Sequence, residues 1–87
     1  MDVKDLKYFV AVYEARGFSR ACLQLGTVQS NVSTRIRALE SSLGVILFER
    51  RYRDVIPTES GAKLYARAKQ LIAELDEARK TLQLVHG

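Results

Sequence analysis

Apolar residues recur at alternating intervals of four and three through the C-terminal part of this sequence, which predicts one long helix there. The positions are Leu64, Ala68, Leu71, Leu75, Ala78, Leu82 and Val85. A repeat of 3.5 residues keeps one seam of a helix facing a partner helix along its length. We therefore expect a helix that is capped by Thr58, runs to about Leu84 and measures about 40 Å.

The seam of this helix is too long for the rest of the chain to cover. Only its first turn, near Leu64 and Tyr65, is expected to pack against the preceding residues, because the other predicted helices are short. An exposed seam of Leu and Ala favours a partner. The sequence thus predicts a homodimer through residues 64–85, and it leaves open whether the two helices run parallel or antiparallel.

Glycine residues divide the first part of the chain into three shorter helices, each with one apolar face. They are predicted over residues 3–16, between Ser19 and Gly26, and over residues 28–42. Gly17, Gly26 and Gly44 are the expected stops, and Ser19 is the expected N-cap of the second helix. The residues expected to face the core are Leu6, Phe9, Val10 and Tyr13, then Ala21, Cys22 and Leu25, then Val32, Ile36, Leu39 and Leu43.

Residues 47–56 follow no helical period and are rich in β-branched and aromatic side chains around a polar middle. They predict two short strands with Arg51 to Asp54 near the tip. Pro57 ends the second strand because proline cannot donate a ladder hydrogen bond. The predicted fold is mainly α: a winged helix-turn-helix over residues 1–57, with three helices and a two-stranded wing, followed by a linker and dimerisation helix over residues 58–87.

The exposed face of the third helix has side chains suited to reading DNA. On a helical wheel it consists of small, hydrogen-bonding and basic residues with no acid, with Gln29 on one flank and Asn31 on the other. These residues are Ser30, Ser33, Thr34, Arg37 and Ser41. Such side chains can form hydrogen bonds with base edges. In a helix-turn-helix formed by the second and third predicted helices, the third helix is the one that enters the major groove. Taken alone, the same face also fits an ordinary solvated surface.

The distribution of charge favours a nucleic-acid partner. The formal net charge is +4, but residues 16–53 alone carry +5, from seven arginines and two acids. All five lysines lie outside this segment. The planar guanidinium of arginine can bind phosphate through two parallel hydrogen bonds. The tip Arg51-Tyr52-Arg53 therefore looks like a wing that lies on the DNA backbone or in the minor groove, the alternative being a loop made basic for solubility.

Several other classes of protein are excluded by what the sequence lacks. Cys22 has no second cysteine for an internal disulfide, and with His86 alone it cannot close a zinc site, so Cys22 is expected to be a buried structural thiol. No apolar run approaches the ~20 residues that span a membrane, and the N-terminus is unlike a signal peptide. No catalytic pocket or phosphate loop is evident. We expect a cytoplasmic non-enzyme without a metal or cofactor in this chain.

Seven short stretches occur together in a recognisable order and spacing. They are Leu6-Lys7-Tyr8-Phe9-Val10-Ala11-Val12, Phe18-Ser19-Arg20-Ala21, Gln29-Ser30-Asn31-Val32-Ser33, Ile36-Arg37-Ala38-Leu39-Glu40, Leu43-Gly44-Val45, Leu47-Phe48-Glu49-Arg50 and Pro57-Thr58-Glu59-Ser60-Gly61. With them the chain resembles, over essentially its whole length, the N-terminal DNA-binding domain of LysR-type transcriptional regulators.

The resemblance implies sequence-specific binding of double-stranded promoter DNA. It implies base contacts from Gln29, Ser30 and Ser33 with Asn31 beside them, phosphate contacts from Ser19, Arg20 and Arg50, and a wing contact from Arg53. From the wheel and the charges we add Thr34 as a base reader, Arg35 and Arg37 as backbone contacts, and Arg51 as a wing residue. We expect no membrane partner.

The same resemblance implies how such a protein is assembled. A dimer or a dimer of dimers would bind an interrupted palindrome, and a small inducer bound elsewhere would change the contact with RNA polymerase. The family's linker helices pair antiparallel, which would place half-sites more than one helical turn (~34 Å) apart. Family members are several times longer and carry an effector-sensing domain after the linker helix, so the inducer site is expected outside these residues.

The sequence departs from the family pattern at two places in the third helix. The family usually has Ser or Thr immediately before the glutamine, whereas Val28 precedes Gln29 here, so the cap must come from Thr27 or from elsewhere. The family often has Arg at the position of Thr34. Here Arg35 follows and points sideways on the wheel, toward a phosphate or a local acid.

Two alternatives remain at this stage. A basic coiled-coil interaction module would bind protein or membrane and would show weak DNA affinity that is indifferent to sequence. A MarR-type winged-helix regulator would also bind DNA, but the position of the long helix after the wing argues against it.

Overall fold

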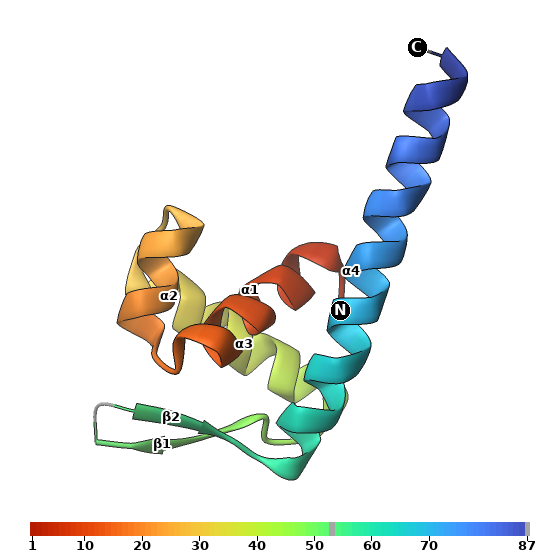
Figure 1. Ribbon diagram of the computed structural model, residues 1–87. Coiled ribbons are helices and arrows are strands. Elements are labelled where there is room, and N and C mark those ends of the chain that lie inside the picture. The colour runs from red at the N-terminus through yellow and green to blue at the C-terminus, as the bar shows by residue number, and fades with distance from the viewer. Residues whose placement is uncertain (53, 87) are drawn as a thin grey trace.

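The computed structural model describes residues 1–52 and 54–86, with the backbone alone at positions 85 and 86. Its elements are α1 (Val3–Ala15), α2 (Phe18–Leu25), α3 (Gln29–Leu43), β1 (Phe48–Arg51), β2 (Asp54–Pro57) and α4 (Glu59–His86). Three short helices and the two-stranded sheet form a body from which α4 projects (Figure 1). The predicted order of helices, hairpin and long helix is confirmed, and the helix ends differ from the prediction by one or a few residues.

The core lies where α1, α2 and α3 meet the sheet and the first turns of α4. The side chains with the least exposure are those of Phe9, Val12, Ala21, Val32, Ile36, Leu39, Leu47 and Ala68. The apolar stripe predicted for α3 is therefore buried through Leu39. Leu43, its predicted last member, is 37% exposed, because it occupies the final position of α3 at the edge of the body.

The turn between α1 and α2 differs from the prediction. Arg16, rather than Gly17, takes the left-handed conformation that ends α1 (φ 57°), and Gly17 is the N-cap of α2 in place of Ser19. The Arg20 guanidinium donates to the carbonyl oxygens of Ala15, at 2.7 Å, and of Arg16, which satisfies this helix end. A Cβ at position 17 would lie 2.9 Å from Arg20 Nη2, so glycine gives that side chain its room.

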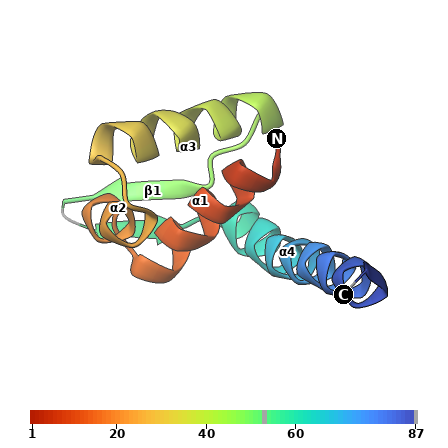
Figure 2. The same ribbon diagram turned by 90° about the horizontal axis from the view of Figure 1, so that it is seen from above.

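The wing is an antiparallel pair in which Arg51 is opposite Asp54 and Phe48 is opposite Pro57. It is joined to α3 by Glu40, whose Oε2 accepts the Leu47 N–H at 2.8 Å. Figure 2 shows α3 along one side of the body, with its N-terminal end toward α2 and the wing tip, and α4 projecting from the opposite end. The candidate reading surface and the long helix therefore lie at opposite ends of the body.

The start of α4 is fixed by a close approach to the chain before β1. Thr58 caps the helix as predicted, since its Oγ1 accepts the Gly61 N–H at 3.1 Å. The Thr58 N–H donates to Leu47 O at 3.0 Å. A Cβ at position 61 would lie 2.3 Å from that same carbonyl oxygen, so only glycine fits.

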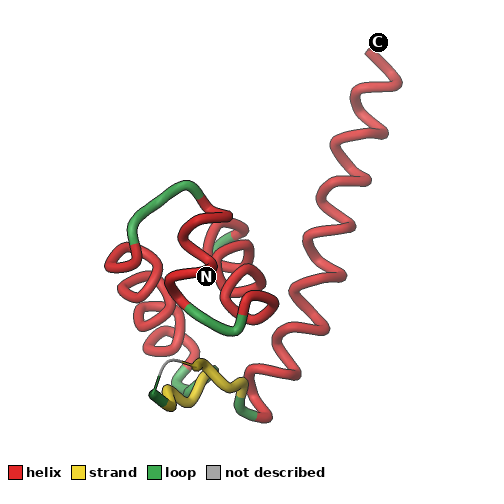
Figure 3. Tube along the Cα trace, turned by 60° about the vertical axis from the view of Figure 1, so that its left-hand side comes forward, coloured by secondary structure: helices red, strands yellow, loops and turns green. Residues whose placement is uncertain are grey.

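Tyr13 of α1 and Tyr65 of α4 hold the first turns of α4 against α1. The rings of Tyr13 and Tyr65 stack with centroids 3.9 Å apart and planes 7° from parallel. The Tyr65 hydroxyl donates to Glu14 Oε2 at 2.6 Å, and Lys69 lies 3.4 Å from the same oxygen. The hydrogen bond from Tyr65 and the charge of Lys69 lower the pKa of Glu14, although some loss of hydration acts in the opposite direction. Farther along, α4 stands apart from the body (Figure 3).

None of the helices formed by residues 1–52 and 54–86 has the length and hydropathy needed to cross a membrane.

Candidate nucleic-acid interface

An open depression on the exposed side of α3 collects most of the predicted base readers. It is lined by Gln29, Ser30, Ser33, Thr34, Arg37 and Arg50. The first five come from α3 and the last from β1. The structure thus brings amide, hydroxyl and guanidinium groups together on one surface, and its lining contains no acid.

A second depression adjoins the first between α2, the start of α3 and the wing. It is lined by Gly17, Phe18, Ser19, Arg20, Gln29, Arg50, Tyr52, Asp54 and Val55. Gln29 and Arg50 line both depressions, which makes the two surfaces continuous. The acid in this lining, Asp54, lies 3.8 Å from Arg20.

Gln29 is oriented by a side chain from α2. Ser19 Oγ donates to Gln29 Oε1 at 2.9 Å. An amide oxygen has two acceptor sites and an amide nitrogen has two hydrogens. This contact therefore leaves Gln29 with a second acceptor site and its Nε2 donors, which are the groups that an adenine edge requires.

Arg50 is placed over α3 by stacking. Its guanidinium carbon lies 4.6 Å from the centroid of the Phe18 ring, and Nη1 donates to Ser33 Oγ at 3.4 Å. The side chain remains exposed. Stacking on an aromatic face restricts the guanidinium without using up its donors, so Arg50 retains hydrogen-bonding capacity for a phosphate.

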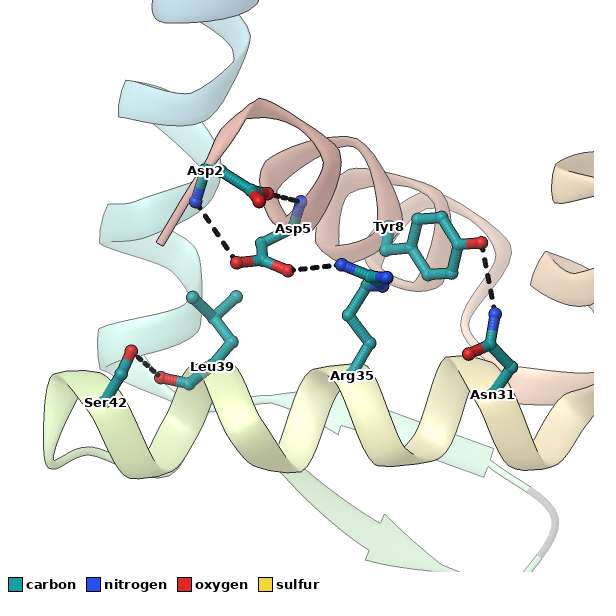
Figure 4. A network of polar contacts seen from close by, with 7 residues as sticks. All are labelled: Asp2, Asp5, Tyr8, Asn31, Arg35, Leu39 and Ser42. Carbon is teal, nitrogen blue, oxygen red and sulfur yellow. Dashed lines mark hydrogen bonds and ion pairs between the residues drawn. The ribbon is translucent and has the colours of Figure 1, made fainter.

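Arg35, which the helical wheel directs to the side of the exposed face, is held by an acid of α1. Its Nη1 lies 2.9 Å from Asp5 Oδ1, and the guanidinium is 4.9 Å from the centroid of the Tyr8 ring (Figure 4). Only 27% of the Arg35 side chain is exposed. The local acid considered as the alternative to a phosphate is therefore Asp5, and a contact of Arg35 with the DNA backbone stays a prediction.

The ion pair changes the titration of Asp5. Burial by itself would raise the pKa of this carboxyl group. The hydrogen bonds from Arg35 and from the Asp2 N–H, together with the positive charge of Arg35, outweigh burial and hold the pKa below its usual value of 3.8. Asp5 is thus held ionised and serves to join α1 to α3.

Asn31 points toward α1 rather than into the depression. Its Nδ2 donates to Tyr8 Oη at 3.3 Å and to Thr27 Oγ1 at 3.0 Å, and Figure 4 shows the side chain turned to Tyr8. The N-cap of α3 is Val28, which makes no side-chain cap bond. The expected cap at Thr27 is therefore replaced by a contact in which Thr27 accepts from Asn31.

The remaining arginines predicted to contact DNA differ in whether another side chain of the protein already binds them. Arg37 is exposed on α3. Arg51 lies 3.0 Å from Glu49 Oε2 within the wing. The predicted wing residue Arg53 lies outside the described residues. Sequence reasoning missed Tyr8 and Phe18, which support Asn31 and Arg50 through contacts that no local pattern in the sequence reveals.

A model of the family described as bacterial regulatory helix-turn-helix protein, lysR family, matches residues 3–62. The chain belongs to the lysR family. It is 42% identical to the HTH-type transcriptional regulator BudR of Raoultella terrigena, over 100% of this chain and 30% of that protein.

Other family members extend the comparison. An uncharacterized HTH-type transcriptional regulator from the ibpB-leuC intergenic region of Azotobacter vinelandii is 41% identical over 100% of this chain and 60% of its own length. The chain therefore spans 30% to 60% of the length of these relatives. Neither the basic interaction module nor the MarR-type alternative is favoured by these matches.

Solved structures of lysR-family domains share this fold. The DNA-binding domain of BenM, in complex with benA site 1 DNA, superposes with a TM-score of 0.94 at 34% identity, over 98% of this chain and 99% of that one. The DNA-binding domain of CbnR, in complex with DNA, gives 0.95 at 29% identity over 100% of both chains. The winged helix-turn-helix followed by a long helix is thus shown.

The apolar seam predicted on α4 divides into a part that packs in the core of its own domain and a part on the projecting helix. Ala68 is wholly buried and Leu64 is partly buried in the core of their own domain, so neither lies free along the projecting helix. Leu71 is 49% exposed and Leu82 is 62% exposed. Leu75 is partly buried, Ala78 is exposed, and the side chain of Val85 lies outside the described residues.

The part of the chain that the structure describes holds no cluster of three or more His, Cys, Asp or Glu that could bind a metal ion. Cys22 is partly buried rather than fully buried as predicted. Its thiol donates to Ser19 O at 3.0 Å within α2.

Proposed function

We propose that this chain binds double-stranded DNA in a sequence-specific manner and acts in transcription control. The observation that carries the proposal is the depression in which Gln29, Ser30, Ser33 and Thr34 lie beside Arg37 and Arg50. Donors and acceptors for base edges are there combined with cations for phosphates. The DNA complexes of the BenM and CbnR domains, which share the fold, support it.

In this proposal α3 enters the major groove. The groove is about 12 Å wide and accepts a helix. The small serines at positions 30 and 33 allow close approach, and Gln29, oriented by Ser19, reads an adenine edge through Nε2 and Oε1. Thr34 is proposed as a fourth reader on the next turn.

Phosphate contacts are proposed on either side of the reading face. Arg50 and Arg37 present exposed guanidinium groups there. The N-terminus of α2 begins at Gly17 without a side-chain cap and lines the second depression together with Ser19 and Arg20. Free N–H groups at a helix N-terminus bind anions well, so the DNA backbone can pass over this end of α2. Arg51 and Arg53 of the wing are proposed as further contacts.

A homodimer through α4 is part of the proposal. Leu71, Leu75, Ala78 and Leu82 leave an apolar seam along the projecting helix. Beside it lies a groove lined in part by Val10, Ala11, Leu25, Ile72 and Ala73. A second copy of α4 would cover both surfaces and place two reading faces on one interrupted palindrome.

The proposal extends to the whole regulator. Assembly into a tetramer, control by an inducer and an indirect effect on RNA polymerase are proposed on the resemblance to LysR-type regulators, of which this chain spans 30% to 60% in the relatives compared above. Promoter DNA in bacteria lies in the cytoplasm, so this function places the protein there. A regulator that acts by binding needs no catalytic residue and no cofactor in this chain.

Selection of bound sites from random double-stranded DNA tests this function. We expect enrichment of two half-sites at a fixed spacing greater than one helical turn (~34 Å). The spacing also reports the direction in which the two α4 helices pair. Binding without any enriched motif would contradict sequence-specific recognition. It would favour the alternative in which the chain is a basic interaction module whose DNA affinity is indifferent to sequence.

A further inference from the structure

The first turn of α3 is held to α1 by one side chain. Asn31 Nδ2 lies 3.3 Å from Tyr8 Oη (Figure 4). The same nitrogen lies 3.0 Å from Thr27 Oγ1. Val28, the N-cap, contributes no side-chain hydrogen bond to this helix end. The Asn31 amide does not cap the helix, because its Nδ2 is a donor, but it ties the first turn both to Thr27 and to α1.

Tyr8 is a rigid acceptor for this contact. Its side chain is buried. The Arg35 guanidinium lies 4.9 Å from the ring centroid and is itself held by Asp5 at 2.9 Å. Asp5 is fixed in turn by the capping box that it forms with Asp2 at the start of α1. Three successive contacts, from Asp2 to Asp5, from Asp5 to Arg35 and from Arg35 to the ring, therefore fix the position of the Tyr8 hydroxyl.

The two amides of the first turn have different groups left for DNA. Bidentate reading of adenine requires an amide N–H donor and an amide oxygen acceptor. Asn31 directs its two N–H donors to Tyr8 and Thr27. Gln29 accepts from Ser19 through Oε1 and keeps its Nε2 donors. Asn31 would have to break contacts within the protein before it could read a base, whereas Gln29 would not.

We infer that Tyr8 is a positioning residue for DNA recognition, acting through Asn31 on the turn that carries Gln29, Ser30 and Ser33, and that Asn31 does not itself read a base. The inference rests on the proposed DNA-binding function. A turn ordered before binding lowers the conformational cost of association. Loss of the contact therefore weakens binding to all sequences alike and leaves the preferred bases unchanged.

Tyr8→Phe, Asn31→Ala and the double variant test this inference. Tyr8→Phe keeps the buried ring and its contact with Arg35, and removes only the hydroxyl. We expect each single variant to lose about three- to tenfold in affinity for the selected site, the range that one hydrogen bond allows. Because both changes delete the same contact, the double variant should bind no more weakly than the weaker single variant.

Tyr65→Phe is the matched control. It also removes a tyrosine hydroxyl from a contact with α1, here the 2.6 Å bond to Glu14 Oε2 at the surface. That contact joins α1 to α4 and does not involve α3. We expect Tyr65→Phe to bind DNA as the parent chain does when circular dichroism shows all variants folded at the temperature of the assay.

Four results would overturn the inference. Asn31→Ala could alter the selected base at one position while Tyr8→Phe binds as the parent chain does, which would make Asn31 a reader. The two effects could add in the double variant, or Tyr65→Phe could lower affinity equally, which would reduce Tyr8 to a general stabilising role. If the parent chain enriches no motif, the proposed function fails in that separate experiment and the inference fails with it.

Discussion

Ser19 Oγ donates a hydrogen bond to Gln29 Oε1 over 2.9 Å and joins α2 to the first turn of α3. The two residues are ten positions apart in the chain. The resemblance to LysR-type regulators assigned Ser19 to phosphate and Gln29 to a base. The contact connects these two roles, because any movement of Ser19 toward a phosphate also changes the position of the Gln29 amide.

Gln29→Ala should reduce affinity for the selected site by about 1–3 kcal/mol and relax one base preference. Ser19→Ala should relax the same position to a smaller extent, because Gln29 keeps its amide but loses its orientation. Site selection with the three proteins measures both effects. Relaxation at different positions in the two variants would show that the Ser19 contact does not orient Gln29 on DNA.

Arg50→Ala should weaken binding to all sequences and lower the slope of log affinity against log salt by about one unit. The reason is that a phosphate contact carries no base information. Fluorescence anisotropy over a salt series measures the slope. Arg67→Ala, which removes the same charge from α4, is the control and should leave the slope unchanged; an equal change there would mean that net charge alone sets it.

Asp5→Asn should destabilise the fold by about 1 kcal/mol near neutral pH, since it removes a charge-assisted hydrogen bond to Arg35. The folded-state pKa of Asp5 lies below 3.8. Its contribution to stability is therefore present above that value and is lost as the pH falls through the lowered pKa. Thermal unfolding at about pH 6 and about pH 3 should show the parent and the variant converging at the lower pH. A constant difference would assign the effect to another group.

Gly61→Ala should destabilise the fold by about 2–3 kcal/mol, because the new methyl group would lie 2.3 Å from Leu47 O and the backbone would have to move. Thermal unfolding followed by circular dichroism measures the loss. Ser60→Ala, one residue earlier on the same turn, should unfold near the parent temperature. An equally stable Gly61→Ala would show that α4 can shift its starting position freely.

Leu82→Asp should convert a dimer to a monomer, because a carboxylate on the seam would be buried against an apolar partner. Leu84→Asp makes the same change two residues away, at a position that is 83% exposed and off the 3.5-residue repeat. Sedimentation equilibrium compares the two variants. A dimer that survives Leu82→Asp, or is lost equally in Leu84→Asp, would contradict the proposed seam.

The order of the elements could be predicted because it depends on neighbouring residues. The stripe of Val32, Ile36 and Leu39 is buried as the helical period predicts, and Thr58 caps α4 through a residue only three positions away. The strand pair ends at Pro57, which cannot donate to a ladder. In each case the physical cause lies within one turn of helix or one strand.

The roles of individual polar residues were decided by partners far away in the chain. The sequence left open whether Arg35 holds a phosphate or a local acid, and the acid is Asp5, thirty residues earlier. Asn31 meets Tyr8 across an interval of 23 residues. A helical wheel gives the direction of a side chain but not what lies there, so it could not distinguish a base from a residue of α1.

The sequence by itself therefore determined the mainly α winged architecture, the basic segment and the side chains available to read DNA, because periodicity, turn residues and charge are local properties. Only the tertiary structure decided which of those side chains remain available. It placed Arg35 and Asn31 against α1, stacked Arg50 on Phe18, and buried Ala68 of the predicted seam. Packing brings together residues that are distant in sequence, and a buried or hydrogen-bonded side chain is no longer free for a partner.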